Sequence, residues 1–145
     1  MTPVAIVGIG ESRVGRLRGL SALRLTLEAA RAAVQDAGVA GAAIDGVLTR
    51  NLDMDVTYMH SQLVAKHLGL KPRFTTDINL GGATAIAMLE QAAILIATGV
   101  CRLILCAYGE NRRTSWAVAR HGCIKMGNED FEDVLDSLGG WGRMR

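Results

Sequence analysis

Short apolar runs alternate along most of the chain with longer stretches in which apolar residues recur at helical spacing. The runs at residues 3–9 and 102–108 are almost continuously apolar, which is typical of strands buried on both faces of a sheet. Residues 44–49 and 74–78 form two shorter runs and predict two further strands. Asp45 and Gly46 fall inside the first of these, so we expect that strand to lie nearer to the edge of the sheet.

The clearest helix begins at Ser21. Ser21 is a suitable N-cap, and Gly38 is well placed to end the helix. Steps of three and four residues place one apolar face toward the core, formed by Leu23, Leu27, Ala30, Val34 and Ala37.

Two more helices are predicted, at residues 58–68 and 83–98. On the first, Met59, Leu63 and, more loosely, His67 lie on one side, and Gly69 ends it. The second follows the glycine pair at 81–82 and is apolar almost all round, which is typical of a buried helix.

The predicted order is therefore β-α-β-α-β-α-β. Strands that alternate with helices predict an α/β fold with a mostly parallel central sheet, right-handed crossovers and helices on both faces. We assign residues 1–113 to this domain. Residues 114–145 have no clear periodicity, and we expect an irregular tail.

Composition narrows the function classes. Half of the 145 residues are hydrophobic but only 4% are aromatic, so small aliphatic side chains must build the core. A net charge of +2 gives no argument for nucleic-acid binding, and we interpret the arginines at positions 13, 16, 18 and 24 as solvated. The longest apolar stretch, residues 83–100, is interrupted by Glu90 and Gln91, so no membrane span is expected.

The cysteines fit a reducing compartment. Without a recognisable secretory signal, an odd number of cysteines argues against a disulfide framework. We therefore expect a cytoplasmic protein with reduced thiols at Cys101, Cys106 and Cys123. Cys106 lies inside an apolar run, where a thiol is normally inert, and Cys123 lies between Arg120 and Lys125 without a paired base.

Two other chemical signals are incomplete. Gly8 and Gly10 follow a predicted strand, but the third glycine of a dinucleotide fingerprint comes late, at Gly15, and the next strand ends in Arg50 instead of an acid. The histidines at 60 and 67 share a predicted helix face but are too far apart to bind one metal alone, and His121 lies in the tail. We therefore expect no metal site and no tightly bound cofactor.

Residues 77–110 carry the most information. They read as a strand, a glycine turn, a buried helix and a final strand. A glycine turn that opens a helix places free N–H groups at the positive helix end, where a nucleophile or an anion would be stabilised. The same glycines also fit a purely structural purpose, namely close approach of the helix to the sheet. The residues alone do not separate these two interpretations.

Four segments in order resemble the thiolase superfamily. They are VAIVGIGESRVGRL, LRLTLEAARAAVQDAGV, IDGVL and GGATAIAMLEQAAILIATGVCRLILCAYGEN, which together cover most of residues 3–113. They are most similar to the branch of thiolase-like lipid-transfer and acetyl-CoA acetyltransferase proteins. The resemblance implies a thiolase-like N-terminal half and a place in acyl-CoA or lipid metabolism.

The sequence departs from that family at one decisive position. In thiolases the turn before the buried helix reads roughly Cys-Ala-(Ser/Thr)-Gly, whereas here it reads Gly82-Ala83-Thr84-Ala85. Gly82 has no side chain, so no covalent acyl-enzyme can form there. We therefore assign no catalytic residue, and classical thiolysis at this turn is excluded.

Members of the family without the cysteine act as retro-aldolases on side-chain acyl-CoA thioesters of sterols, usually with a small partner protein. The resemblance thus implies a coenzyme A thioester as substrate and a base and oxyanion site that the residues do not reveal. Nothing after Arg113 resembles the second half of a thiolase. We therefore expect an N-terminal fragment that is inactive alone and exposes apolar surface on residues 83–98 and at a sheet edge. The alternative is a non-catalytic subunit that binds acyl-CoA or pairs with a thiolase-fold chain in a homo- or hetero-oligomer.

Overall fold

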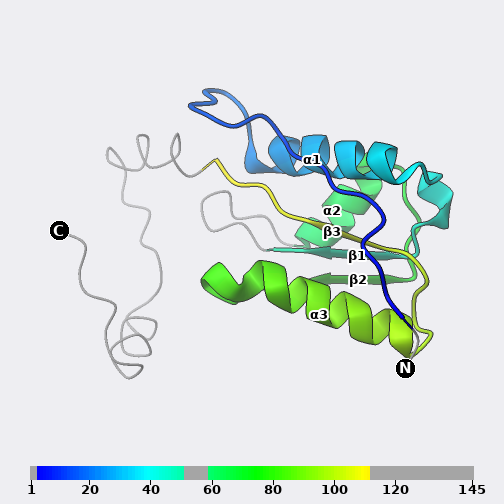
Figure 1. Cartoon of the computed structure of the whole chain (residues 1–145). Coiled ribbons are helices and arrows are strands. Elements are labelled where there is room, and N and C mark those ends of the chain that lie inside the picture. Colours follow the sequence, from blue (N-terminus) through cyan, green and yellow to red (C-terminus); the bar gives the residue numbers. More distant parts are fainter. Residues whose placement is uncertain (1–2, 51–58, 112–145) are drawn as a thin grey trace, which may run out of the picture.

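The computed structural model describes residues 3–50 and 59–111. In this part of the chain, a parallel sheet has the strand order β2-β1-β3 (Figure 1). The strands are β1 (Gly46–Thr49), β2 (Phe74–Asp77) and β3 (Ile104–Ala107). The helices are α1 (Ala22–Ala37), α2 (His60–His67) and α3 (Thr84–Ala97), and two 3-10 turns, η1 (Gly41–Ala43) and η2 (Gly81–Ala83), precede β1 and α3. The predicted α/β class and the parallel sheet are confirmed.

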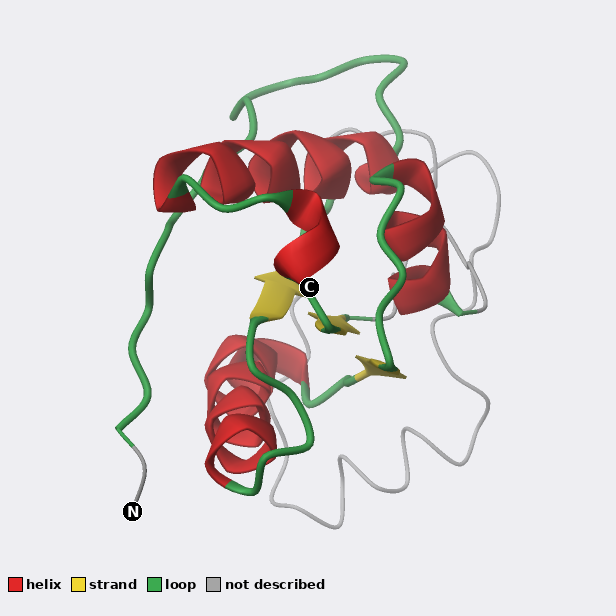
Figure 2. Cartoon of the chain, turned by 90° about the vertical axis from the view of Figure 1, so that its right-hand side faces the viewer, coloured by secondary structure: helices red, strands yellow, loops and turns green. Residues whose placement is uncertain are grey.

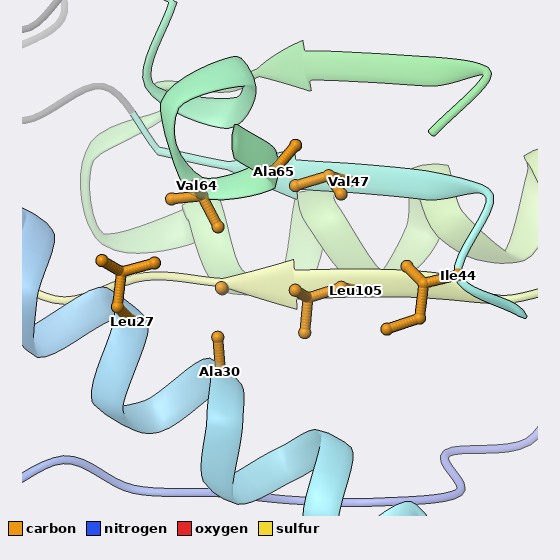
Figure 3. Packing of buried hydrophobic residues seen from close by; sticks show 8 residues of the cluster. Leu27, Ala30, Ile44, Val47, Val64, Ala65 and Leu105 are labelled. Carbon is orange, nitrogen blue, oxygen red and sulfur yellow. The ribbon is translucent and has the colours of Figure 1, made fainter. Parts of the chain in front are cut away.

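Helices cover both faces of the sheet, as predicted. Helices α1 and α2 lie on one face and α3 lies on the other (Figures 1 and 2). Because side chains alternate along a strand, Val47 points toward α1 and α2 while its neighbour Leu48 packs against α3. We name the first cluster the α1/α2 core (Figure 3); it contains Leu27, Ala30, Ile44, Val47, Val64, Ala65, Leu105 and Ala107. The second, the α3 core, contains Leu48, Met88 and Ala92.

Helix α1 forms as the sequence predicts. The Ser21 hydroxyl accepts a hydrogen bond from the Arg24 N–H at 3.2 Å, and Gly38 ends the helix with a left-handed backbone at φ 64°. Of the predicted apolar face, Leu27 and Ala30 belong to the α1/α2 core, and Leu23 and Val34 pack against it. Local capping and tertiary packing therefore agree here.

The prediction that the strand at residues 44–49 lies nearer to the edge is wrong. Strand β1 is the central strand, and all of its residues are buried. Asp45 is compatible with this place because its carboxylate accepts hydrogen bonds from the backbone N–H groups of Arg102 and Leu103 at 2.9–3.0 Å. Gly46 is needed there, since a Cβ atom would lie 2.9 Å from Ile104 Cγ1.

The predicted strand at residues 3–9 is not formed. This segment belongs to no sheet, and Ile6 and Ile9 are 70% and 75% exposed. It lies along α1, where the Ile9 N–H donates to Asp36 Oδ2 at 2.9 Å. An apolar run forms a strand only beside another strand with free backbone groups, and no described strand lies alongside it. The observed order is therefore α-β-α-β-α-β.

Helices α2 and α3 differ from their predicted burial. Helix α2 buries His60 and Val64, while Met59 is 63% exposed, so the predicted face is wrong by about a quarter turn. Helix α3 has its predicted bounds within one residue at each end, but Ile86 and Ile94 are 69% and 56% exposed. Burial of α3 is therefore confined to the side that faces the sheet, and the expected exposure of apolar surface on this helix is confirmed.

Candidate functional site

Polar side chains gather where the three parallel strands end. Parallel strands present their carboxyl ends at one edge of the sheet, which is where open α/β sheets bind ligands. Here Arg50 follows β1, Asn79 follows β2 after one intervening residue, and Tyr108 and Glu110 follow β3. We call these four residues the carboxyl-edge cluster.

Arg50 connects the three strand ends. Its Nη1 donates to the Tyr108 hydroxyl at 2.6 Å and lies 3.9 Å from Glu110 Oε2, while its Nε donates to Asn79 Oδ1 at 3.3 Å. The guanidinium also lies 5.0 Å from the centre of the Tyr108 ring. The Arg50 and Glu110 side chains are only 8% and 7% exposed. Buried charges are retained only when they are paired and hydrogen-bonded, so this is a built polar site and not a solvated surface.

Of Arg50, Glu110 and Tyr108, which contact one another, the tyrosine is the one that reaches solvent. The residue is 37% exposed, and its hydroxyl donates to Glu110 Oε2 at 2.6 Å. The phenol oxygen therefore lies between a carboxylate that accepts its proton and a guanidinium that donates to it. This arrangement suits a group that transfers protons.

The turn that opens α3 lies directly beside the cluster. Asn79 Oδ1, which accepts from Arg50, also accepts from the Gly81 N–H at 3.3 Å. Thr84 closes the turn, because its hydroxyl accepts from the Leu80 N–H at 2.9 Å and donates to the Gly81 carbonyl at 2.8 Å. Gly81 has φ 58°, a left-handed value that favours glycine.

Gly82, which the resemblance aligns with the thiolase nucleophile, lies in the exposed turn before α3. The residue is exposed, and a Cβ atom built on it would meet no heavy atom of residues 3–50 and 59–111 within 4 Å. The structural interpretation that glycine is needed here for close approach therefore does not apply to Gly82. The site has room for a side chain at the start of α3 but carries none.

The histidines do not form a site. His60 and His67 are the first and last residues of α2 and, seven positions apart, share one side of the helix as predicted, but His60 is fully buried and His67 is exposed. Asp77 stabilises the same helix start, since its Oδ1 accepts from the Ser61 N–H at 2.8 Å and from the Thr49 hydroxyl. His121 lies outside the described residues. Within residues 3–50 and 59–111, no group of three or more His, Cys, Asp or Glu side chains is arranged to hold a metal ion.

The two described cysteines are poor nucleophiles. Burial raises the pKa of Cys106 to about 11, in agreement with the expectation of an inert thiol. Burial, together with the nearby Asp45 carboxylate, also raises the pKa of Cys101. Cys123 lies outside the described residues.

Gly8 and Gly10 do not form a phosphate-binding loop. They contact the side of α1, where added Cβ atoms would lie 2.5 Å from the Ala33 carbonyl oxygen and 2.2 Å from the Ala33 nitrogen. Neither glycine lies at a helix N-terminus, where a dinucleotide would bind. No helix among the described residues is long and apolar enough to span a membrane.

A shallow hollow of about 420 Å³ lies at the opposite edge of the sheet, between the C-terminal ends of α1 and α2. Val34, Leu68 and Leu70 contribute apolar surface to it, and Arg31 and His67 lie at its border. The buried ion pair between Arg50 and Glu110 belongs to the carboxyl-edge cluster and not to this hollow. The carboxyl edge is therefore the stronger candidate for a functional site.

The sequence signal for the cluster was present but incomplete. Each apolar run is followed at once, or after one residue, by a polar side chain, which is the pattern that a carboxyl-edge site requires. The sequence marks Arg50 only as a residue that does not fit a dinucleotide site. It does not reveal Asn79, Tyr108 and Glu110, because their proximity depends on which strands are neighbours.

Sequence relatives agree with this architecture, although no protein-family model matches the chain. A steroid side-chain-cleaving aldolase of Thermomonospora curvata is 32% identical over 138 residues, which are 94% of this chain and 34% of the aldolase. The 17-hydroxy-3-oxo-4-pregnene-20-carboxyl-CoA lyase of Mycobacterium tuberculosis is 34% identical over 135 residues, 92% of this chain and 34% of the lyase. An acetyl-CoA acetyltransferase of Methanocaldococcus jannaschii is 33% identical over 138 residues, 93% of this chain and 35% of that enzyme.

Solved structures give the same result. The Ltp2-ChsH2(DUF35) aldolase matches with a TM-score of 0.70 and 30% identity over 93% of this chain and 33% of its own. A monomeric SCP2-thiolase-like protein type 1 of Mycobacterium smegmatis matches with a TM-score of 0.61 and 28% identity over 82% of this chain and 25% of its own.

The chain thus spans about a third of the length of the curated relatives that it matches. Sequence and fold agree over almost all of this chain, and the predicted resemblance is confirmed. Over almost all of its length, the chain is therefore similar in sequence and fold to proteins of the thiolase superfamily.

Proposed function

We propose that this protein acts on acyl-CoA thioesters without a cysteine nucleophile and cleaves the carbon–carbon bond beside the thioester. The observation that carries the proposal is Gly82, an exposed glycine at the turn where a thiolase has its nucleophile. The relatives named as a side-chain-cleaving aldolase and a CoA lyase support this reaction class.

The chemistry is consistent with the absence of a nucleophile. In a retro-aldol cleavage, a base takes the proton of the β-hydroxyl group and the Cα–Cβ bond breaks. A carbonyl group forms at Cβ, and the electron pair enters the thioester as an enolate, which then takes a proton at Cα. No bond to the protein forms and no oxidant is needed, so the reaction class requires proton transfer and enolate stabilisation only.

We place turnover in an assembly and not in this chain alone. Residues 1–113 would form the thiolase-like domain, and residues 114–145 an irregular tail. We propose that the isolated chain binds the thioester at the carboxyl edge, and that a further thiolase-fold chain completes the active site. The name of the Ltp2-ChsH2(DUF35) aldolase, which joins two components, supports such an arrangement.

A thiol introduced at Gly82 tests whether the thioester reaches this turn. In a Cys123→Ser background, the Gly82→Cys variant is incubated with acetyl-CoA, and its mass and the released coenzyme A are measured. We expect Gly82→Cys to gain an acetyl group at least about tenfold faster than Ala85→Cys, because binding orients the thioester at the turn. Ala85 is the matched control, since it is also exposed and only three residues away. The proposal fails if both variants are acetylated at the same rate, or if the parent protein is acetylated.

A second candidate function, a non-catalytic partner subunit, is favoured by the exposed side of α3. Ile86, Leu89 and Ile94 are 69%, 43% and 56% exposed on one helix. Exposed apolar patches of this kind mark interaction sites. Stable co-purification of the chain with a longer thiolase-fold protein, abolished by Ile86→Asp, together with acetylation of Gly82→Cys no faster than that of Ala85→Cys, would support this function over the first. A chain that stays monomeric in the presence of such a protein would contradict it.

A further inference from the structure

The proposed cleavage needs a group that accepts the proton of the substrate's β-hydroxyl. In the described part of the chain, the carboxyl-edge cluster contains a tyrosine whose hydroxyl is hydrogen-bonded directly to a carboxylate. The Tyr108 hydroxyl donates to Glu110 Oε2 at 2.6 Å, a distance typical of a strong, charge-assisted hydrogen bond. A proton can therefore pass from the phenol to the carboxylate without further movement of either group.

Exposure distinguishes Tyr108 from its two charged hydrogen-bond partners. Arg50 and Glu110 are enclosed, with side chains 8% and 7% exposed, whereas Tyr108 is 37% exposed. Through its hydrogen bond to Glu110, the exposed tyrosine can pass a proton from a ligand to the buried carboxylate.

Hydrogen bonds connect Tyr108 to the Gly82 turn. Arg50 donates to the phenol oxygen at 2.6 Å and to Asn79 Oδ1 at 3.3 Å, and the Gly81 N–H donates to the same Asn79 oxygen at 3.3 Å. The turn and the phenol thus share Arg50 and Asn79 as hydrogen-bond partners, and our scheme takes the acyl carbons of a thioester bound at the turn to extend toward the phenol. This step rests on the proposed function.

We propose that Tyr108 is a catalytic residue that accepts the β-hydroxyl proton of a β-hydroxyacyl-CoA while it passes its own proton to Glu110. The Cα–Cβ bond then breaks, and the electron pair enters the thioester as an enolate. The proton held by Glu110 returns through Tyr108 to Cα, so that protons and electrons balance and the cluster is restored.

Arg50 is a positioning residue in this scheme. Its guanidinium donates to the phenol oxygen on which negative charge develops as the proton leaves, and it fixes Asn79 at the turn. The charged groups that the described structure places against the phenol are Arg50 and Glu110.

The test compares two ligands that differ by one hydroxyl group. Binding of 3-hydroxybutyryl-CoA and butyryl-CoA to the full chain is measured by isothermal titration calorimetry. We expect the parent protein to prefer the hydroxylated ligand by about threefold to tenfold, the effect of one net hydrogen bond. Tyr108→Phe should bind both ligands with the affinity of the parent protein for butyryl-CoA. A purely structural role would weaken both ligands equally and leave their ratio unchanged.

Three variants complete the experiment. Tyr58→Phe, which changes the other tyrosine of the chain, should keep the preference. Glu110→Gln and Arg50→Lys should reduce it, because each alters one partner of the phenol oxygen. Retention of the preference in Tyr108→Phe overturns the proposal, and so does a parent protein that binds the two ligands equally.

A second measurement applies if Tyr108→Phe does not fold. Incorporation of 3-fluorotyrosine gives two fluorine resonances, which Tyr58→Phe assigns. We expect the Tyr108 resonance to shift with 3-hydroxybutyryl-CoA and to shift less with butyryl-CoA; equal shifts overturn the proposal. Failure of the proposed function is recognised separately, because Gly82→Cys would then be acetylated no faster than Ala85→Cys. In that case the assignment of Tyr108 falls with it.

Discussion

The two faces of the sheet differ in how much of the apolar surface of their helices is buried. On one face, α1 and α2 enclose an eight-residue core between themselves and the strands. On the other face, α3 packs Met88 and Ala92 against Leu48 in a smaller core, and much of its apolar surface remains exposed. Helix α3 is the more apolar helix along its whole circumference, yet it is the less buried one. The apolar residues of a helix limit how much apolar surface it can bury, and the neighbouring elements determine how much of that surface is buried.

The largest loss of stability is expected for a substitution in the α1/α2 core. Leu27→Ala removes a side chain that is 7% exposed in the α1/α2 core and should lower the free energy of unfolding by about 3 kcal/mol. The matched change on the open face, Ile94→Ala, should alter it by less than about 0.5 kcal/mol, because that side chain is 56% exposed. Urea denaturation followed by circular dichroism measures both. Equal losses would contradict the contrast between the two faces.

A smaller loss is expected where the N-terminal segment meets α1. A Cβ atom at Gly10 would lie 2.4 Å from the Ala29 carbonyl oxygen, so Gly10→Val should separate the segment from the helix and cost about 2 kcal/mol. Gly82→Ala is the control, because it adds a Cβ in open space and should change stability by less than about 0.5 kcal/mol. The same denaturation experiment applies, and hydrogen exchange of the Ile9 amide, which bonds to Asp36, reports the detachment directly.

Substitutions on the exposed side of α3 should affect association more than stability. Replacement of both Ile86 and Ile94 with serine removes apolar area from α3 and should weaken self-association or partner binding by roughly tenfold, with little change in unfolding. Val14→Ser is the control, since Val14 is 92% exposed but lies in the loop before α1. Sedimentation velocity measures the effect. A double variant that associates like the parent protein would show that α3 is not the contact surface.

The smallest expected effect on stability concerns Asp45, which directly precedes the central strand. Burial opposes ionisation of this carboxylate, but the backbone N–H groups of Leu103 and Arg102 and the Arg102 charge prevail and lower its pKa. A pKa lowered in the folded state contributes stability above the unfolded pKa, and that contribution is lost as the pH falls through the folded value. Asp45→Asn should therefore be less stable than the parent protein at neutral pH and should flatten the acid side of its pH–stability profile. An unchanged profile would contradict this assignment.

The sequence predicted the local features well. The limits of α1, with its serine cap and terminal glycine, follow from rules that involve only neighbouring residues. The bounds of α3 and the strands at β2 and β3 also follow from local periodicity. The interest of Gly82 came from the resemblance, since a glycine is uninformative without the pattern of the family, whereas the space around it came from the structure.

The failures involve partners that are distant in the sequence. The segment at residues 3–9 has the composition of a strand but lies against α1, and β1 was expected near the edge because Asp45 seemed unfavourable in a central strand. The carboxylate of Asp45 is stabilised by residues 57 and 58 positions away, which no local pattern reveals. Arg50 and Tyr108 likewise form their hydrogen bond across 58 positions.

The sequence by itself determined the limits of α1 and α3, the strands β2 and β3, and the resemblance to the thiolase superfamily. These properties depend on side chains within a few residues of one another or on a motif in fixed order. Only the tertiary structure decided that β1 is central, that one side of α3 is exposed, and that Arg50, Tyr108 and Glu110 form one cluster. The physical reason is that strand order and long-range hydrogen bonds join residues far apart in the chain, and their energies depend on geometry that periodicity does not encode.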